Sequence, residues 1–150
     1  MKPIEIKITG RIDKSSSEIC AEFLDTTRWS EFKGYAMLPG IKQAQFTVRT
    51  PELIGSKISV QNMDGSSHVE EIIEWDTARQ IAMRFQEFSP PLRHFATHFI
   101  EVWEFRPFAN GTMVTRRMTM YPKGVMGWLI LLPISKLMRK AFAKHLADMS

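Results

Sequence analysis

The sequence predicts an α+β fold in which a curved antiparallel sheet of seven strands wraps around one long carboxyl-terminal helix, in a single domain covering residues 1–150. Two observations support this prediction. Apolar residues follow a period of two over most of residues 42–121, whereas after residue 121 they recur at spacings of three and four. The turns between successive strands are also short, and short connections require antiparallel neighbours.

The segment before residue 42 contains one strand and two short helices. Ile4 to Ile12 alternates apolar and polar residues, as a half-buried strand does. Ser15 and Glu18 match a capping box, in which the serine caps the helix and the glutamate reaches back to the serine backbone amide. A second helix is expected from Thr27 to Phe32, before Met37-Leu38-Pro39-Gly40 turns the chain.

Six further strands follow this turn. Asp64-Gly65 and Asn110-Gly111 are dipeptides that tolerate the positive φ angles of tight hairpins. Ser89-Pro90-Pro91 marks a looser connection, because consecutive prolines cannot donate hydrogen bonds to a neighbouring strand. The six predicted strands are Ala44 to Arg49, Gly55 to Asn62, His68 to Trp75, Gln80 to Phe88, Phe95 to Arg106 and Thr112 to Tyr121.

The last residues predict an amphipathic helix. Apolar positions from Ile134 to Met149 recur at spacings of three and four, and lysines and arginines occupy other positions around the helix. The preceding stretch, Val125 to Ile134, is almost wholly apolar, but it is too short to cross a bilayer and contains Pro133. We interpret it as the buried first turns of the same helix, kinked near Pro133, or as a segment that covers a pocket or lies at an interface.

The net charge of +4 is confined to this terminal segment. Residues 1–120 contain 15 basic and 15 acidic residues, whereas residues 121–150 contain five basic residues against Asp148. This pattern is typical of a solvated basic helix face, or of one that meets an anionic membrane surface. We expect no nucleic acid as partner, because nucleic-acid binding usually requires a broader basic surface interleaved with aromatic residues.

The sequence contains no signature of a cofactor or metal site. His94 and His98 are four residues apart, and on a strand this spacing separates the two imidazoles by roughly 13 Å. A glycine-rich phosphate loop and a serine nucleophile elbow are also lacking. The lone Cys20 and an amino terminus without a continuous apolar stretch favour a cytoplasmic protein. We therefore expect neither a cofactor nor a metal.

Several short motifs resemble those of one known superfamily. They are Trp29 with Phe32, Leu38-Pro39-Gly40-Ile41, Glu52-Leu53-Ile54-Gly55, Glu74-Trp75-Asp76, Glu101-Val102-Trp103-Glu104-Phe105 before Asn110-Gly111-Thr112, and Tyr121-Pro122-Lys123-Gly124. On these motifs nearly the whole chain resembles the SRPBCC superfamily of START-like domains, which includes polyketide cyclases, the birch-pollen allergen fold and coenzyme Q-binding proteins. The resemblance implies a helix-grip fold with an apolar cavity between sheet and helix. It does not choose among binding, transport and chemistry.

The register of the last two strands predicts which side chains face this cavity. A two-residue turn at Asn110-Gly111 would place six side chains on one mostly apolar face by pairing Phe105 with Arg116, Trp103 with Met118 and Glu101 with Met120. Glu101 and Arg116 would then need a partner, water or a ligand, because an unpaired charge in an apolar setting is costly. Alternatively, each lies near a wet end of the sheet or belongs to a structural ion pair.

Glu71 is the second candidate for an inward carboxylate. It alternates with Val69, Ile73 and Trp75, and together with Glu101 it could act as an acid and base pair, or it could be paired structurally.

The many methionines indicate either ordinary core packing or an adaptable pocket wall. The predicted ligand-binding residues are Glu71, Met83, Phe85, Phe99, Glu101, Trp103, Phe105, Arg116, Met118, Met120, Trp128, Met138 and Phe142.

We therefore expect the chain to bind a small hydrophobic molecule, by resemblance a lipid, quinone, polyketide or related aromatic compound. The first alternative is a polyketide-cyclase-like or dehydratase-like enzyme, in which Glu101, Glu71, Arg116 or His145 moves protons or polarises a carbonyl. The second alternative is peripheral docking of the basic terminal helix on an anionic membrane or a partner. The sequence predicts neither the ligand nor the oligomeric state.

Overall fold

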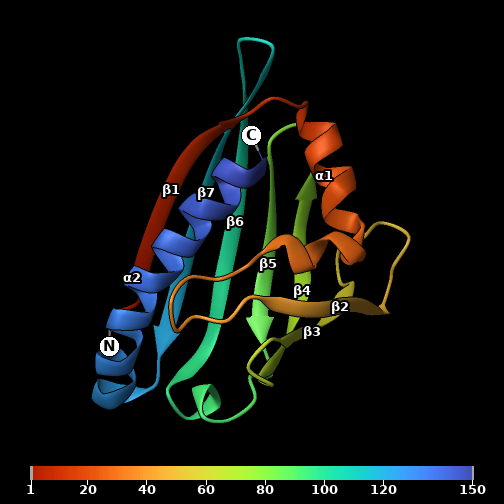
Figure 1. Cartoon of the computed structure of the whole chain (residues 1–150). Helices are drawn as coiled ribbons and strands as arrows, with labels where there is room; N and C mark the ends of the chain where they lie inside the picture. Colours follow the sequence, from red (N-terminus) through yellow and green to blue (C-terminus); the bar gives the residue numbers. More distant parts are fainter. Residues whose placement is uncertain (1, 150) are drawn as a thin grey trace.

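The computed structural model describes residues 2–149 and confirms the helix-grip prediction (Figure 1). Seven antiparallel strands form one sheet in the order β1-β7-β6-β5-β4-β3-β2, and helix α2 (Gly124–Met149) lies across one face of it. The strands are β1 (Ile4–Ile12), β2 (Ile41–Val48), β3 (Lys57–Asn62), β4 (Ser67–Asp76), β5 (Gln80–Gln86), β6 (Ala96–Phe108) and β7 (Gly111–Pro122). The shorter helices are α1 (Ser16–Leu24), η1 (Thr26–Glu31) and η2 (Leu92–His94).

The short helices after β1 begin where the capping residues require. Ser15 Oγ accepts a hydrogen bond from the Glu18 amide at 3.2 Å, and Glu18 Oε1 accepts one from the Ser15 amide at 3.3 Å. This is the predicted capping box, and it fixes the start of α1. The second helix, η1, is a 3₁₀ helix capped by Asp25, whose Oδ1 accepts from the Thr27 amide.

The hairpin between β6 and β7 turns one residue earlier than predicted, which shifts the register of the two strands by two residues. Phe108 pairs with Gly111, so the turn residues are Ala109 and Asn110, and Ala109 adopts the positive φ. Gly111 is instead the first residue of β7, where a Cβ would collide with the carbonyl oxygen of Ile12. The predicted turn was wrong because this glycine serves a close approach of two strands.

The actual register pairs Glu101 with Met118, Trp103 with Arg116 and Phe105 with Val114. These pairings replace the predicted partners Met120, Met118 and Arg116. Because the error is an even number of residues, each side chain stays on the predicted face of the sheet. The buried face of β7 therefore still carries Arg116 with Met118 and Met120.

Strand β4 contains an irregularity that reverses one part of the prediction. Ile72 pairs with Met83 and Glu74 with Ala82, which leaves Ile73 as an extra residue in a β-bulge. Glu70 and Ile72 before the bulge are buried, at 4% and 0% exposure, and Trp75 after it packs against the core. Glu71 therefore does not face inward as predicted. Its Oε1 accepts a hydrogen bond from Gln86 Nε2 at 3.2 Å.

The first turns of α2 are not buried as one interpretation expected. Val125, Met126 and Leu129 are 61%, 63% and 51% exposed. Gly127 is buried against the backbone carbonyl of Phe95, and a Cβ at this position would collide with that carbonyl. The glycine thus lets α2 lie directly against the segment that precedes β6, while Pro133 is accommodated inside the helix.

The apolar core forms two clusters on the inner face of the sheet. One joins α1 and the end of α2 to the sheet and includes Ile19, Ile72, Ile81, Trp103 and Leu146. The other lies beneath the middle of α2 and includes Phe99, Met118, Met120, Leu131 and Phe142. Burial of this apolar surface provides the main stabilisation of the contact between helix and sheet.

We predict that Leu131→Ala destabilises the fold by about 2–5 kcal/mol, because Leu131 is fully buried between α2 and the sheet. Lys136→Ala, on the exposed side of the same helix, should change the free energy of unfolding by less than about 0.5 kcal/mol. Urea unfolding followed by circular dichroism measures both. Similar small losses in the two variants would show that α2 is not docked on the sheet.

Candidate functional site

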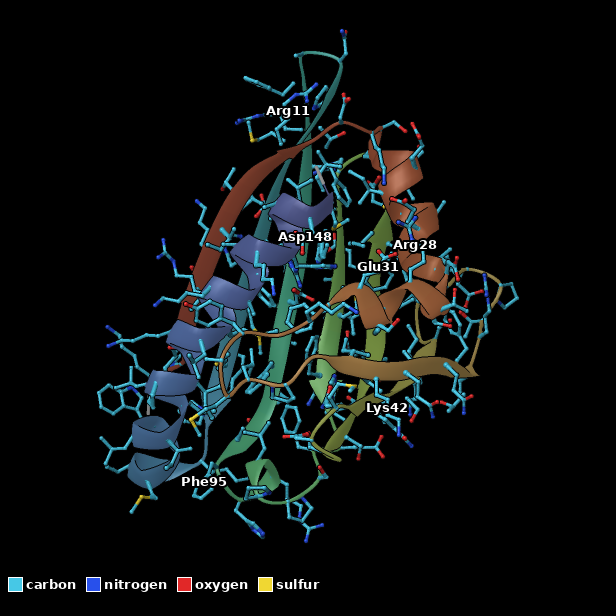
Figure 2. All side chains as sticks on the ribbon, viewed as in Figure 1. Arg11, Arg28, Glu31, Lys42, Phe95 and Asp148 are labelled. Atoms are coloured by element: carbon cyan, nitrogen blue, oxygen red, sulfur yellow. The ribbon has the colours of Figure 1, made fainter. Side chains whose placement is uncertain are left out.

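A cavity of about 670 Å³ lies between the inner face of the sheet and α2. Its lining residues include Phe95, near η2, and Asp148, near the end of α2, and Figure 2 shows these two labelled residues toward different ends of the molecule. The cavity therefore runs along the helix. Its apolar walls include Phe85, Phe99 and Trp103 from the sheet, Ile134, Leu137, Met138 and Phe142 from α2, and Phe23, Trp29 and Phe32 from α1, η1 and the residue after η1.

A buried ion pair lies in the wall of this cavity. Arg116 Nε and Nη2 donate to Glu101 Oε2 at 3.0 and 2.6 Å, and the two residues are only 4% and 3% exposed. The guanidinium carbon of Arg116 also lies 4.4 Å from the ring centre of Trp103 and 3.7 Å from that of Phe142. Two aromatic rings and one carboxylate thus hold the cation in a buried position.

His145 completes this polar cluster from α2. Its Nδ1 lies 3.0 Å from Arg116 Nη1, and an arginine can only donate, so Nδ1 accepts and the imidazole proton is on Nε2. Burial, together with the charge of Arg116, lowers the pKa of His145 to about 3. The imidazole is therefore neutral at physiological pH. His145 lines the cavity, and its ring has one N–H donor, at Nε2.

A second polar pair lines the cavity from β4. His68 Nε2 lies 2.8 Å from Glu70 Oε2, and the imidazole stacks on Phe85 with ring centres 5.0 Å apart. Burial raises the pKa of Glu70, and the charge of Glu101 adds to this rise, although the hydrogen bond with His68 opposes it. The pair is a second, largely buried polar group in the wall of the cavity.

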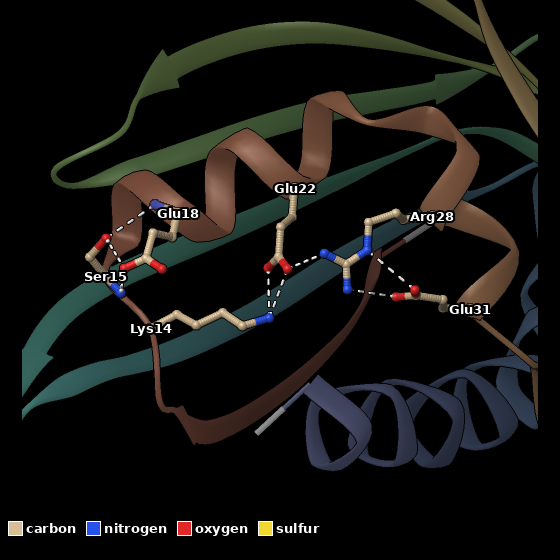
Figure 3. A network of polar contacts seen from close by, with 6 residues as sticks. All are labelled: Lys14, Ser15, Glu18, Glu22, Arg28 and Glu31. Carbon is tan, nitrogen blue, oxygen red and sulfur yellow. Dashed lines mark hydrogen bonds and ion pairs between the residues drawn. The ribbon is translucent and has the colours of Figure 1, made fainter.

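Four charged residues form a network at the end of the cavity nearest η1 (Figure 3). Lys14 Nζ donates to both carboxylate oxygens of Glu22, at 2.7 and 3.0 Å, and Arg28 bonds both Glu22 and Glu31. Although burial acts to raise it, the hydrogen bonds from Lys14 and Arg28 lower the pKa of Glu22. The network ties the segment after β1 to α1 and η1.

The structure brings seven of the predicted ligand-binding residues into the lining of one cavity. They are Phe85, Phe99, Glu101, Trp103, Arg116, Met138 and Phe142. The others lie elsewhere. Met83, Met118 and Met120 are fully buried in the core, Phe105 is buried beside them, Trp128 is half-buried on α2, and Glu71 bonds Gln86 away from the cavity. The sheet methionines therefore contribute to core packing.

A family model described as "Polyketide cyclase / dehydrase and lipid transport" matches residues 12–150. The chain belongs to this family. It is thereby a member of the SRPBCC superfamily, as the sequence motifs suggested. No curated protein matches the sequence.

Solved structures of the same architecture agree with this family. A START superfamily protein from Mycobacterium smegmatis has 13% identity and a TM-score of 0.65, with 97% of this chain and 99% of that chain covered. A protein from Thermus thermophilus has 17% identity and a TM-score of 0.71, with coverage of 97% and 96%. Major latex-like protein 151 from Panax ginseng has 12% identity, a TM-score of 0.64 and coverage of 100% and 99%. Identities this low show a shared fold alone.

Family membership does not show which residues have a chemical role. The sequence did not predict that His68 and Glu70 line the cavity. Alternation counted through the bulge at Ile73 puts Glu71 on the inner face and therefore puts His68 and Glu70 on the opposite, outer face, whereas both line the cavity. Their alternation with Ile72 alone was the signal that could have placed them inward. The loop residues Met37, Leu38 and Pro39 also line the cavity, and no periodic pattern could have placed them there.

Other reactive groups in the described part of the chain are few. Burial, with the charge of Asp76, raises the pKa of the Cys20 thiol to about 12, so the sulfur is not a nucleophile at neutral pH. Within residues 2–149, no group of three or more His, Cys, Asp or Glu side chains could hold a metal ion. Over the same residues, no helix combines the length and apolar character that a membrane span needs.

We predict that His145 makes the fold less stable in acid. The unfolded chain binds a proton at this residue near pH 6.5, whereas the folded chain binds it only near pH 3, so stability is lost as the pH falls between these values. His145→Asn keeps an acceptor for Arg116 and does not titrate. Its free energy of unfolding should therefore fall less steeply below pH 6.5, by up to about 1.4 kcal/mol per pH unit.

Urea unfolding between pH 7 and pH 4.5 tests this prediction, with His94→Asn at an exposed position as the matched control. Equal pH dependence in wild type and His145→Asn would contradict the buried, neutral state of the imidazole.

Proposed function

We propose that this chain is a carrier that binds one small, predominantly apolar molecule in the cavity between the sheet and α2. The observation that supports the proposal is the cavity itself, whose volume of about 670 Å³ falls in the usual range for small-molecule sites. Its walls are mainly aromatic and aliphatic, with a few polar groups held in fixed positions. The lone buried Cys20 favours a reducing compartment, and we place the carrier in the cytoplasm.

The state of the polar groups favours binding over turnover. A general acid or base works best with a pKa near the operating pH, and the pKa of His145 lies far below it. Glu101 and Arg116 are bonded to each other in a buried ion pair. The His68 and Glu70 pair is the remaining candidate for acid and base chemistry. A cyclase-like or dehydratase-like activity would therefore depend on it, and Glu70→Gln would abolish that activity.

We predict that filling part of the cavity weakens binding. Leu137→Trp places an indole into the lining, so the affinity for an environment-sensitive apolar dye should fall about tenfold. Leu129→Trp makes the same change at an exposed position of α2 outside the lining and should bind the dye as wild type does. Fluorescence titration measures both. Dye binding that is unaffected by Leu137→Trp would show that the dye binds elsewhere.

A second candidate function is exchange of the ligand at an anionic membrane surface. The exposed side chains of Val125, Met126 and Leu129 precede Ile130 and Pro133, which line the cavity. Exposed apolar side chains at a cavity rim are unfavourable in water and favourable in a lipid headgroup layer. Exposed basic residues on the same helix, Lys136, Arg139 and Lys140, would add attraction to acidic lipids.

We predict that the chain sediments with vesicles of phosphatidylcholine and phosphatidylserine, and that salt weakens this binding. Met126→Ser with Leu129→Ser should reduce the bound fraction several-fold, as should replacing Lys136, Arg139 and Lys140 with Gln. Phe108→Ser, on the exposed β6–β7 hairpin at the opposite end of the molecule, is the control (Figure 1). Equal binding to vesicles of phosphatidylcholine alone would exclude the electrostatic part of this proposal.

A further inference from the structure

We propose that the cavity selects an uncharged apolar molecule that carries an oxygen acceptor, such as a ketone or an ester, and discriminates against the corresponding carboxylate. The inference rests on the proposed function and names the chemical class of the ligand. It is based on which hydrogen-bonding groups the polar cluster leaves free, and on how the charges of the lining residues are already paired.

The free groups of the cluster include one N–H donor. His145 uses Nδ1 to accept from Arg116, which leaves its Nε2–H as the remaining polar group of the ring. Trp103 also lines the cavity, but its Nε1 is buried away from the hollow and has no hydrogen-bond partner among the described residues, so it is not offered to a ligand. The donor that the cluster offers is therefore the Nε2–H of His145. A donor without a partner in an apolar setting is unfavourable, and a ligand oxygen that accepts from it would remove that cost.

The basic groups of the lining are already neutralised. Its described lysines and arginines are Lys14, Arg28 and Arg116, and each forms an ion pair with a glutamate. The lining also contains more acidic than basic residues, namely Glu22, Glu31, Asp64, Glu70, Glu101 and Asp148. A ligand carboxylate would therefore enter a site of low dielectric that has no unpaired cation and two nearby buried glutamates. Its desolvation would not be compensated.

A cationic head group is disfavoured for a different reason. A ligand ammonium placed at the cluster would lie close to the guanidinium of Arg116, which the rings of Trp103 and Phe142 fix in place. It would also find the acceptor nitrogen of His145 already occupied by Arg116. The neutral donor is complementary to a carbonyl oxygen, and a hydroxyl could in addition donate to Glu101, because both bonds from Arg116 end on Oε2.

Four probes with the same chain length test the inference by displacement of the apolar dye at neutral pH. They are methyl nonyl ketone, undecane, undecanoate and undecylamine. Water solvates the ketone better than undecane, so these two affinities are compared after correction for transfer from water to alkane. The ketone should then bind roughly tenfold more tightly than undecane, the value of one good hydrogen bond. At equal concentration it should also bind more tightly than either charged probe. Undecanoate or undecylamine binding as tightly as the ketone would overturn the inference.

Two variants assign the selectivity to the cluster. His145→Met offers a thioether sulfur as a weak acceptor and brings no N–H donor, so the corrected ratio of ketone to undecane affinity should fall from about tenfold toward one. Glu101→Gln leaves Arg116 without its counter-ion, and undecanoate should then gain at least tenfold relative to the ketone. Circular dichroism checks that both variants are folded. If Glu101→Gln does not fold, the ratio in His145→Met still decides.

The outcomes separate this inference from the proposed function. If the corrected affinities of the ketone and undecane are equal in wild type, or if both variants keep the wild-type ratios, the cavity binds apolar molecules without selecting their head group, and only the inference is wrong. If none of the four probes displaces the dye, the proposed function is contradicted together with the inference.

Discussion

The ion pair between Glu101 and Arg116 determines how the sheet and the terminal helix fit together. Removing one partner of such a buried pair typically costs about 3–5 kcal/mol, because the remaining charge has no compensation. The buried pair therefore needs further groups that shield it and bond to it. Helix α2 provides them with the ring of Phe142 and the acceptor nitrogen of His145. Since Glu101 and Arg116 come from the neighbouring strands β6 and β7, the pair holds the helix over the side of the sheet that β1 and β7 form. The cavity is the space that remains beside this contact.

The two ends of the cavity are held by different means. At one end Gly127 lets α2 approach the backbone of Phe95, and Lys123 Nζ donates to the carbonyl oxygen of Arg93. At the other end the network centred on Glu22 joins the segment after β1 to α1 and η1. Ile81 and Trp103 of one core cluster and Phe99 and Phe142 of the other line the cavity, so it lies between the two clusters. The fold is thus packed around a hollow that its own side chains do not fill.

Much of this architecture was predictable from the sequence, because period and capping act locally. The capping box at Ser15, the period-two strands and the terminal helix all appear as expected. Glu101, Trp103 and Arg116 were placed on the correct face despite a register error of two residues, since parity alone decides the face. The bulge at Ile73 has no local signature, and it moved the inward carboxylate from Glu71 to Glu70. Alternation shows on which face of the sheet a side chain lies, but not whether it borders the cavity or packs in the core. Met83, Met118 and Met120 were therefore predicted to line the cavity, although they are fully buried in the core.

A carrier with this cavity should retain its ligand through purification, because the apolar walls and the fixed polar cluster act on the molecule together. Native mass spectrometry of the purified chain, followed by release and identification of any bound molecule, tests this account most directly. The account predicts a one-to-one adduct with an uncharged apolar compound that contains at least one oxygen, and a smaller fraction of adduct when Leu137 is replaced by Trp. A chain that carries no adduct and takes up no apolar molecule offered to it, or one that retains a carboxylate, would contradict it.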